Sequence, residues 1–356
     1  MHKTFSLKNF RCFEDLTLDD LTRVNLLTGK NNVGKTALLE GMFLHAGPAN
    51  PSLPTHVNVM RGIEQYSLDA EEIWGWLFFR KNMRQPIEIA AVDSAHRETR
   101  LLITLGQPEV MQLPGVGNAL EDVDSNGSTS TENPTRDLVL RYVDESGASH
   151  LSNATVTTEG KLEGRPAHVE KLPQTVFLTS RARHQEDDAR RFSNLQRVGQ
   201  DDFVIEAVRL IEPRVKRIGV LLTGGRSLLN ADVGLPEWIP LRFLGEGVGK
   251  LLTIVLAIAD SPGGKILIDE TENGFHYSVM PLVWRVIADV AARRNVQVFA
   301  TSHSWECVNA AHEVFRKIAP ESLRLYRLEK VKDVIRHVSY NCEAFDAAMV
   351  GELEVR

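Results

Sequence analysis

The sequence predicts an α/β fold with a buried, mainly parallel sheet and a phosphate-binding loop, and three observations lead to this prediction. Continuous apolar runs, "VNLLTG", "KILIDE" and "VQVFATSH", are typical of parallel strands that helices cover on both faces. Segments with helical spacing follow the first two runs, at "KTALLEGMFLHA" and near "SVMPLVWRVIADVAARR". Between the first run and its helix, "GKNNVGKT" fits the phosphate-loop pattern G-x-x-x-x-G-K-[ST].

The remaining elements follow in chain order. "KTFSLKNFRCFEDLTL" alternates apolar and polar residues, which predicts a half-buried antiparallel strand pair near the N-terminus. Further strands are expected at "IEIAAV", "RLLITL" and "LVLRYVDESGASHL", whereas Leu120–Asp137 is polar enough to predict a flexible surface insertion. After "TVFLTS" the pattern becomes helical from about Asp187. The helix between the last two apolar runs would be the crossover of a βαβ unit.

Composition excludes several classes of protein. The 356 residues allow two average domains or one large α/β domain with insertions. A net charge of −6 argues against a broad surface that coats nucleic acid, although a local basic groove remains open. The three cysteines lie far apart without CxxC spacing, which indicates neither a zinc site nor a disulfide framework. No signal core or bilayer-length apolar run is present, so we expect a cytoplasmic protein without membrane contact.

The phosphate loop predicts a site for ATP. Its backbone N–H groups would wrap the β-phosphate, the Lys35 ammonium would reach the β and γ oxygens, and the Thr36 hydroxyl would ligate Mg²⁺. Together with Ala37 in the first turn of the helix, the predicted nucleotide-binding residues are Gly29, Lys30, Asn31, Asn32, Val33, Gly34, Lys35, Thr36 and Ala37.

Polar residues at the ends of the later strands complete the predicted site. Asp269, at the exposed end of "ILID", can hold the Mg²⁺ water shell opposite Thr36, and Glu270 can polarise the attacking water. His303 follows the next strand, where its side chain could sense the γ-phosphate. Two structural acids at a strand end and an ordinary surface histidine are the alternatives. A second glycine-rich turn, Gly245, Glu246 and Gly247, precedes a long apolar helix and could offer backbone N–H groups to an anion.

These segments together resemble a known family. "LKNFRCFEDL", "GKNNVGKT", "LGEGVGK", "ILIDETENGFHYS" and "FATSHS" occur in the order seen in ATP-binding-cassette (ABC)-type heads of the RecF, SMC and OLD group. Within it, the chain is most similar to free-standing bacterial OLD/RecF-like AAA ATPases. The resemblance implies one P-loop NTPase of the ABC-ATPase-head type with a mixed sheet lobe and a helical signature lobe. Its parts would be 1–179 with the Walker A loop, 180–258 with the signature loop, and 259–356 with Walker B and the switch histidine.

The resemblance also implies roles for residues. Lys35 and Thr36 match Walker A, Asp269 matches Walker B, and Glu270 and His303 match the catalytic base and the switch histidine. Arg11 matches a strand position that in this group lies near the nucleotide. The signature loop, residues 245–247, would close over the γ-phosphate held by another subunit, which predicts an ATP-dependent homodimer with ATP and Mg²⁺ as cofactors. The family's signature serine is absent, and the Q-loop glutamine is unassigned between Gln174 and Gln185.

The expected partners follow from what the chain lacks. No heptad pattern suggests SMC arms, and residues 304–356 are too few for the nuclease domain of OLD proteins. An effector, a nuclease or a toxin in DNA repair or phage defence, would therefore be a separate protein. A RecF-like DNA-binding clamp and a transporter ATPase subunit are the alternatives. The arginines of 180–192 could line a DNA groove or lie on solvated helix faces, and the aromatic stretch 71–79 could pack the core or bind a partner.

Overall fold

The structure is a computed structural model that describes residues 1–62, 70–106, 137–157, 161–169, 172–179 and 185–350. The predicted insertion, Leu120–Asp137, lies outside the described residues apart from Asp137.

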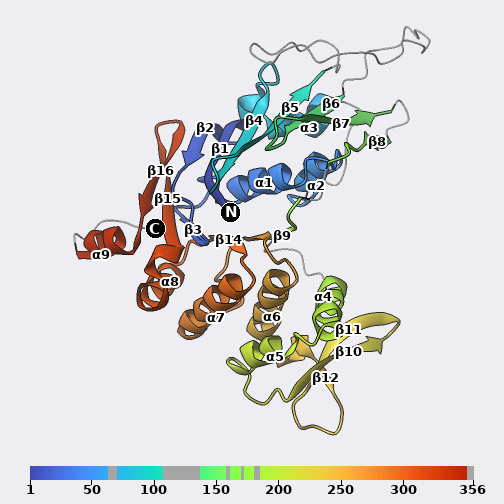
Figure 1. Ribbon diagram of the computed structural model, residues 1–356, viewed down its shortest axis with the longest axis vertical. Helices are drawn as coiled ribbons and strands as arrows, with labels where there is room; N and C mark the ends of the chain where they lie inside the picture. Colours follow the sequence, from blue (N-terminus) through green and yellow to red (C-terminus); the bar gives the residue numbers. More distant parts are fainter. Residues whose placement is uncertain (63–69, 107–136, 158–160, 170–171, 180–184, 351–356) are drawn as a thin grey trace.

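A central six-stranded sheet contains all three apolar runs (Figure 1). Of its five strand pairings, four are parallel, and the edge pair of β15 and β16 is antiparallel. The residues of β3 and β14 are buried at every position, as expected of strands covered on both faces. In spatial order the strands are β16 (Val334–Tyr340), β15 (Leu323–Val331), β3 (Val24–Thr28), β14 (Gln297–Thr301), β13 (Lys265–Ile268) and β9 (Thr175–Leu178).

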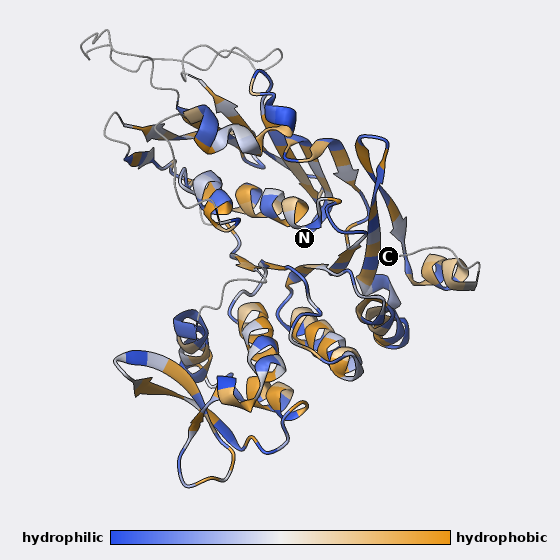
Figure 2. Cartoon of the chain, turned by 180° about the vertical axis from the view of Figure 1, so that it is seen from behind, coloured by the Kyte–Doolittle hydropathy of each residue, from blue (hydrophilic) through white to orange (hydrophobic). Residues whose placement is uncertain are grey.

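Successive residues of the central strands face two different cores. In β13, Ile266 and Ile268 pack with the helices on one face, whereas Leu267 packs with the α1 side on the other. Figure 2 shows apolar residues along the central strands and on the helices packed against them. The helix α1 (Lys35–Ala46) lies on one face, and α6 (Glu246–Ala259), α7 (Met280–Arg293) and α8 (Trp305–Ile318) lie on the other (Figure 1).

A second, seven-stranded antiparallel sheet lies beyond α1 (Figure 1). It confirms the predicted N-terminal strand pair, because β1 and β2 are antiparallel neighbours. Between α1 and β4, the chain forms α2 (Leu53–Val59), α3 (Ala70–Trp74) and two 3-10 turns, η1 (Gly75–Leu77) and η2 (Phe79–Lys81). The strands are β2 (Phe13–Leu18), β1 (His2–Phe10), β4 (Ile87–Asp93), β5 (Glu98–Leu105), β6 (Leu138–Val143), β7 (Ser149–Val156) and β8 (Leu162–Arg165).

The aromatic stretch 71–79 serves mainly as core. Trp74, Leu77 and Phe78 are buried in the cluster that also contains the inner residues of the antiparallel sheet. Trp76 alone among its large aromatic residues is strongly exposed. The packing interpretation of this stretch is therefore confirmed for the three buried side chains.

The stretch 180–258 contains more than the helices that its pattern predicts. After α4 (Gln185–Arg197) and α5 (Asp202–Arg209) the chain forms a three-stranded sheet of β10 (Arg217–Thr223), β11 (Arg226–Asp232) and β12 (Ile239–Pro240). Gly224 and Gly225 both have positive φ, 58° and 79°, and connect β10 to β11 by the two-residue hairpin that two such residues favour. The 3-10 turn η3 (Leu241–Leu244) then leads into α6.

The C-terminal part completes the central sheet. The 3-10 turn η4 (Tyr277–Val279) precedes α7, which connects β13 to β14 as the predicted crossover, and η5 (Pro320–Ser322) follows α8. The last helix, α9 (Cys342–Val350), packs on α8. None of the helices in the described part of the chain has the length and apolar character that a membrane span requires. The predicted fold class is confirmed at the level of an α/β P-loop architecture, with a mixed sheet part and a helical part.

Candidate active site

The phosphate loop lies between β3 and α1, at the carboxyl edge of the central sheet. Gly29 and Gly34 have φ values of 130° and 92°, which a residue with a side chain rarely adopts. A Cβ atom at Gly29 would lie 2.3 Å from the Leu328 carbonyl oxygen, and one at Gly34 would lie 2.6 Å from Cys12 Sγ. The loop therefore depends on glycine at both positions, because neighbouring chain segments close tightly around it.

The Lys35 side chain is directed along this loop. Its Nζ donates to the carbonyl oxygens of Gly29 at 2.6 Å and Lys30 at 2.9 Å. Burial lowers the pKa of Lys35, while the carboxylates of Glu272, Asp269 and Glu270 oppose that shift. The ammonium is thus held in the loop by hydrogen bonds to two backbone carbonyls.

Thr36 and Asp269 meet as the motif predicts. Thr36 Oγ1 donates to the Asp269 carboxylate at 3.1 Å, and Thr301 Oγ1 donates to Asp269 Oδ1 at 2.7 Å. Burial raises the pKa of Asp269, and these hydroxyl hydrogen bonds oppose the shift.

The oxygen donors of this pair fit Mg²⁺, a hard cation that is usually held by one or two protein ligands together with water and phosphate oxygens. Among the described residues, no group of three or more His, Cys, Asp or Glu side chains could hold a metal ion alone. Thr36 and Asp269 are the residues that would hold the ion.

Glu270 occupies an unusual backbone conformation. Its φ is 51°, a left-handed value that costs a non-glycine residue on the order of 1 kcal/mol or more. Three contacts hold it: its N–H donates to Thr301 Oγ1 at 2.8 Å, Asn273 Nδ2 donates to Glu270 Oε2 at 2.5 Å, and Lys250 Nζ donates to the Glu270 carbonyl at 2.7 Å. These contacts hold the Glu270 backbone in its left-handed conformation.

His303 lies at the same edge and is oriented by a glutamate that the motif search did not identify. Its Nδ1 is 2.9 Å from Glu272 Oε1, and its backbone N–H donates to the same oxygen at 2.8 Å. The His303 side chain is 48% exposed, whereas that of Glu272 is 12% exposed. The sequence carries one signal for this pair, since "DETENG" places an additional acid two residues after Glu270.

Arg11 lies beside the phosphate loop, but its side chain is directed elsewhere. The turn that it starts brings Cys12 against Gly34. Arg11 Nε is 3.2 Å from Glu40 Oε2, and Arg61 Nε is 2.6 Å from Glu40 Oε1, with Glu40 almost completely buried on α1. In this arrangement the Arg11 guanidinium is paired with Glu40.

The signature-like turn begins α6 and packs on its own chain. Gly245 has a φ of 120°, and a Cβ atom at Gly247 would lie 3.0 Å from the Gly274 carbonyl oxygen. A Cβ atom at Gly274 would lie 2.8 Å from Glu246 Cγ. The resemblance implies that this turn contacts the nucleotide of a second subunit. In its own chain, the turn contacts the loop that follows Glu270.

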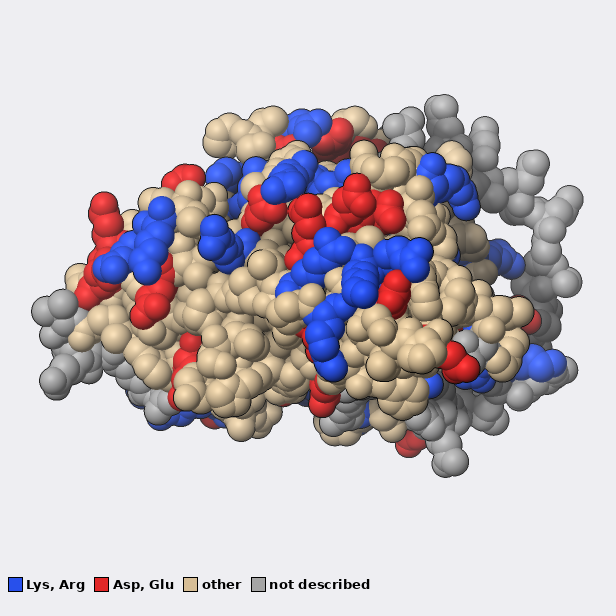
Figure 3. All heavy atoms as spheres, turned by 90° about the horizontal axis from the view of Figure 1, so that it is seen from below, with Lys and Arg blue, Asp and Glu red and all other residues tan. Residues whose placement is uncertain are grey.

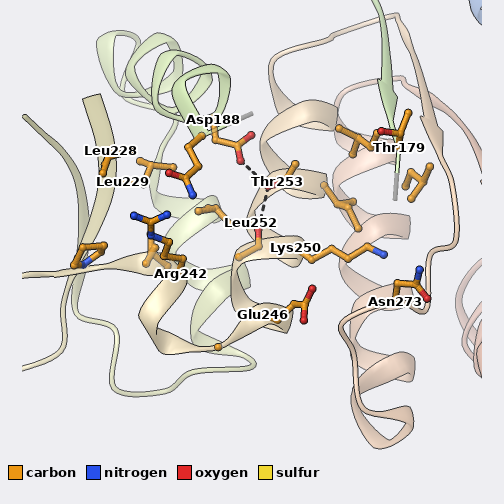
Figure 4. A pocket seen from close by; sticks show the side chains of 18 of the residues that line it. Thr179, Asp188, Leu228, Leu229, Arg242, Glu246, Lys250, Leu252, Thr253 and Asn273 are labelled. Carbon is orange, nitrogen blue, oxygen red and sulfur yellow. Dashed lines mark hydrogen bonds between the residues drawn. The ribbon is translucent and has the colours of Figure 1, made fainter. Parts of the chain in front are cut away.

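A cavity of about 160 Å³ separates this turn from α4 and β11 (Figure 4). Lys250 extends along one side toward Asn273, and Asp188 of α4 accepts a hydrogen bond from Thr253 of α6 at 2.5 Å. Gln185 lines the cavity, whereas Gln174 lies before β9, at the opposite end of that strand from the site. Residues 180–184, which precede α4, lie outside the described ranges.

Several arginines of the helical part pair with nearby acids. Arg190 and Arg191 pair with Asp187 and Asp188, and Arg217 pairs with Asp232. Figure 3 shows the same mixture on one face of the molecule, where a group of Lys and Arg side chains adjoins Asp and Glu side chains. Within the described part of 180–192, both arginines are therefore paired with acids, Arg190 at an exposed position and Arg191 at a buried one.

Comparisons with known proteins identify the family. Residues 24–308 match the protein family described as "AAA domain, putative AbiEii toxin, Type IV TA system". A protein of Helicobacter pylori named ATP/GTP phosphatase is 22% identical over 343 residues, which cover 89% of each chain. An uncharacterised protein of Methanocaldococcus jannaschii, MJECL11, is 31% identical over 83 residues, covering 23% of this chain and 73% of its own.

Solved structures provide a further comparison. The SMC head domain from Thermotoga maritima covers 96% of this chain and 99% of its own, with 13% identity and a TM-score of 0.47. An SMC head bound to the C-terminal winged-helix domain of ScpA covers 97% and 99%, with 10% identity and a TM-score of 0.49.

Proposed function

The chain belongs to the AAA-domain family, and on this premise we propose that it is a switch in which two heads pair across bound Mg-ATP and control a separate effector. The chain is an ATPase of the AAA type. The observation that supports the proposal most strongly is the meeting of Thr36, Asp269, Thr301 and Glu270 beside the Lys35 loop. The proposal concerns what each of these groups does with the nucleotide.

In the proposed binding step, the phosphate oxygens of ATP replace the loop carbonyls as partners of the Lys35 ammonium. Loop N–H groups and the start of α1 provide further positive potential for the phosphates. Thr36 and Asp269 would hold Mg²⁺, which when bound neutralises charge on the β- and γ-phosphates. Thr301 keeps the Asp269 carboxylate in place through its 2.7 Å hydrogen bond.

In the proposed hydrolytic step, Glu270 accepts a proton from the water that attacks the γ-phosphorus, and the bond to the bridging oxygen of ADP breaks. Asn273 orients the carboxylate through its 2.5 Å hydrogen bond. His303, held by Glu272, would donate a hydrogen bond to the γ-phosphate from its other ring nitrogen.

Replacing the proposed base tests this step. Glu270→Gln is expected to lower ATP turnover by about 100-fold or more while ATP binding is retained, because the amide cannot take the proton. Glu206→Gln on α5 is a matched control, since Glu206 is exposed on the helical part. Turnover of Glu270→Gln at the wild-type rate would contradict the proposed base.

Pairing of two heads is supported by the surface around the signature-like turn. Phe243, two residues before Gly245, is 72% exposed, and an aromatic side chain in such a position fits a surface covered by a partner. Phe243→Ser is expected to weaken ATP-dependent dimerisation of Glu270→Gln, whereas Leu222→Ser, which is 77% exposed on the β10–β11 hairpin, is expected to leave it unchanged. Equal dimerisation of both variants would contradict this placement of the interface.

A substitution at Gly247 would not test dimerisation alone, although the motif places this residue at the predicted contact. A bulky side chain there would press on the Gly274 carbonyl of the same chain, so it would disturb the site of an isolated head as well. Gly249 meets nothing within 4 Å and accepts a Cβ atom without that disturbance.

A separate effector, a nuclease or a toxin, is the proposed target, and phage defence or DNA repair is the proposed setting. The matched family description names a putative AbiEii toxin and a type IV toxin–antitoxin system, which supports a defence role. The narrower similarity to OLD/RecF-like ATPases remains a prediction. Gel-shift assays across a salt series, with and without ATP, test direct DNA binding, which the charge-paired arginines do not favour.

A further inference from the structure

Lys250 connects the signature helix to the loop that carries Glu270. It lies in the second turn of α6, five residues after Gly245, and its Nζ donates to the Glu270 carbonyl oxygen at 2.7 Å. The segment "LGEGVGK" ends on this lysine, but the resemblance gives the lysine no role. It joins two elements that are 20 residues apart in the chain and that belong to different parts of the site.

The carbonyl that Lys250 holds belongs to the residue with left-handed backbone geometry. A φ of 51° at Glu270 persists only if surrounding contacts enforce it. Thr301 holds the Glu270 N–H, while the carbonyl also accepts a hydrogen bond from the Asn273 N–H at 3.1 Å. Lys250 supplies a charged hydrogen bond to this carbonyl, and hydrogen bonds from charged donors are roughly twice as strong as those from neutral ones.

The helix that carries Lys250 is itself hydrogen-bonded to α4. Thr253, less than one turn farther along α6, donates to Asp188 of α4 at 2.5 Å, and Arg191 pairs with the same carboxylate at 3.3 Å. The cavity beside α6 is lined by Asp188 and Thr253 and, from β11, by Leu228 and Leu229 (Figure 4). A shift of α6 would therefore be transmitted by Lys250 to the Glu270 carbonyl.

We propose that Lys250 is a positioning residue that couples the signature helix to the hydrolytic carboxylate. Contact of the signature turn with a second head would set the position of α6, and the Lys250 hydrogen bond would then set the backbone of Glu270. This inference rests on the proposed function, because it assigns a means of control to the same ATP site. It assigns Lys250 no direct contact with the nucleotide.

The surroundings of Lys250 give the contact a pH signature. Burial lowers the pKa of Lys250 to about 8, against the opposing effect of the Glu272, Glu270 and Glu246 carboxylates. From α8, Cys307 also faces it, and burial raises the pKa of that thiol to about 12, so the thiol stays neutral. The Phe275 ring lies 5.7 Å from Nζ. Above about pH 8 the ammonium becomes an amine and the hydrogen bond loses its charge.

The experiment compares Lys250→Met, Lys250→Arg and Glu270→Gln with wild type in ATP hydrolysis, fluorescent-ATP binding and thermal unfolding. Lys250→Met is expected to lower kcat by about 10- to 100-fold with KM and ATP binding within about twofold of wild type, as for a small displacement of a catalytic group. Lys250→Arg, which keeps the charge, is expected to recover part of the loss. Lys317→Met, at an exposed position of α8, is the matched control.

The pH profile separates positioning from a merely structural role. Wild-type kcat is expected to fall above about pH 8, and Lys250→Arg is expected to move that fall upward by at least one pH unit, since arginine stays protonated. Wild-type kcat in Lys250→Met, or an identical high-pH fall in wild type and Lys250→Arg, would overturn the inference. If one of these outcomes is found while Glu270→Gln is inactive in the same assay, only the role of Lys250 is refuted. If Glu270→Gln is active, the role of Glu270 as the base is refuted as well.

Discussion

Thr301 is the residue whose loss should disturb the site most specifically. Its hydroxyl donates to Asp269 Oδ1 at 2.7 Å and accepts from the Glu270 N–H at 2.8 Å, and its side chain is fully buried. Thr301→Val keeps the shape and the β-branch that suit a central strand but removes both hydrogen bonds. Thr301→Ser keeps the hydroxyl and is the matched control.

The magnitude follows from the two lost contacts. A hydrogen bond to a charged group contributes about 1.5–3 kcal/mol, and a buried N–H without an acceptor costs about 1–3 kcal/mol. Because Asp269 retains its hydrogen bond from Thr36, we expect Thr301→Val to lower the free energy of unfolding by about 2–4 kcal/mol. Thr301→Ser should lose less than about 1.5 kcal/mol, the cost of one buried methyl group.

Urea unfolding followed by tryptophan fluorescence measures the stability change, and a coupled ATPase assay measures turnover. A lower urea midpoint with an unchanged slope would indicate a change in stability alone. We expect turnover of Thr301→Val to fall at least about tenfold, because both carboxylates lose a fixed partner. Thr301→Val with wild-type stability and turnover would refute the role given to this hydroxyl.

Three further predictions concern charged residues. Burial raises the pKa of Asp269, so the folded state binds the proton of this carboxyl more tightly than the unfolded state and gains stability as the pH falls. Asp269→Asn, which removes the buried charge, should therefore keep or raise the melting temperature while abolishing ATP turnover. A lower melting temperature would contradict this. Glu40→Ala should lower the free energy of unfolding by about 3–5 kcal/mol in urea titrations, because the buried Arg11 loses its counter-charge, and a loss below about 1 kcal/mol would argue against that pairing. His303→Ala and Glu272→Gln should lower kcat non-additively in a double-mutant cycle, because Glu272 acts by orienting His303; additive losses would mean independent roles.

Much of the site could be predicted from sequence because its groups lie at the ends of parallel strands. The motif spacing placed Thr36 at the start of a helix and Asp269 at the end of a strand, and parallel pairing brought these ends to one edge. His303 was placed there by the same reasoning. The covering of the sheet on both faces likewise followed from its continuous apolar runs.

The contacts that orient these groups could not be predicted in the same way. Lys250 and Asp188 belong to helices whose rotation and position depend on packing, so neither residue revealed its partner in the sequence. The resemblance placed Arg11 near the nucleotide, but nothing in the sequence distinguishes its partner, Glu40, from other acidic residues on helices. The β10–β11 hairpin was missed despite a local signal, since two successive glycines between apolar runs favour a two-residue turn.

Sedimentation velocity of Glu270→Gln with and without Mg-ATP tests the central claim most directly, namely that nucleotide is held between two heads. The account predicts a monomer without nucleotide, a dimer with Mg-ATP, and loss of that dimer in the Phe243→Ser double variant. A Glu270→Gln protein that binds ATP yet remains monomeric at every protein and nucleotide concentration would contradict it.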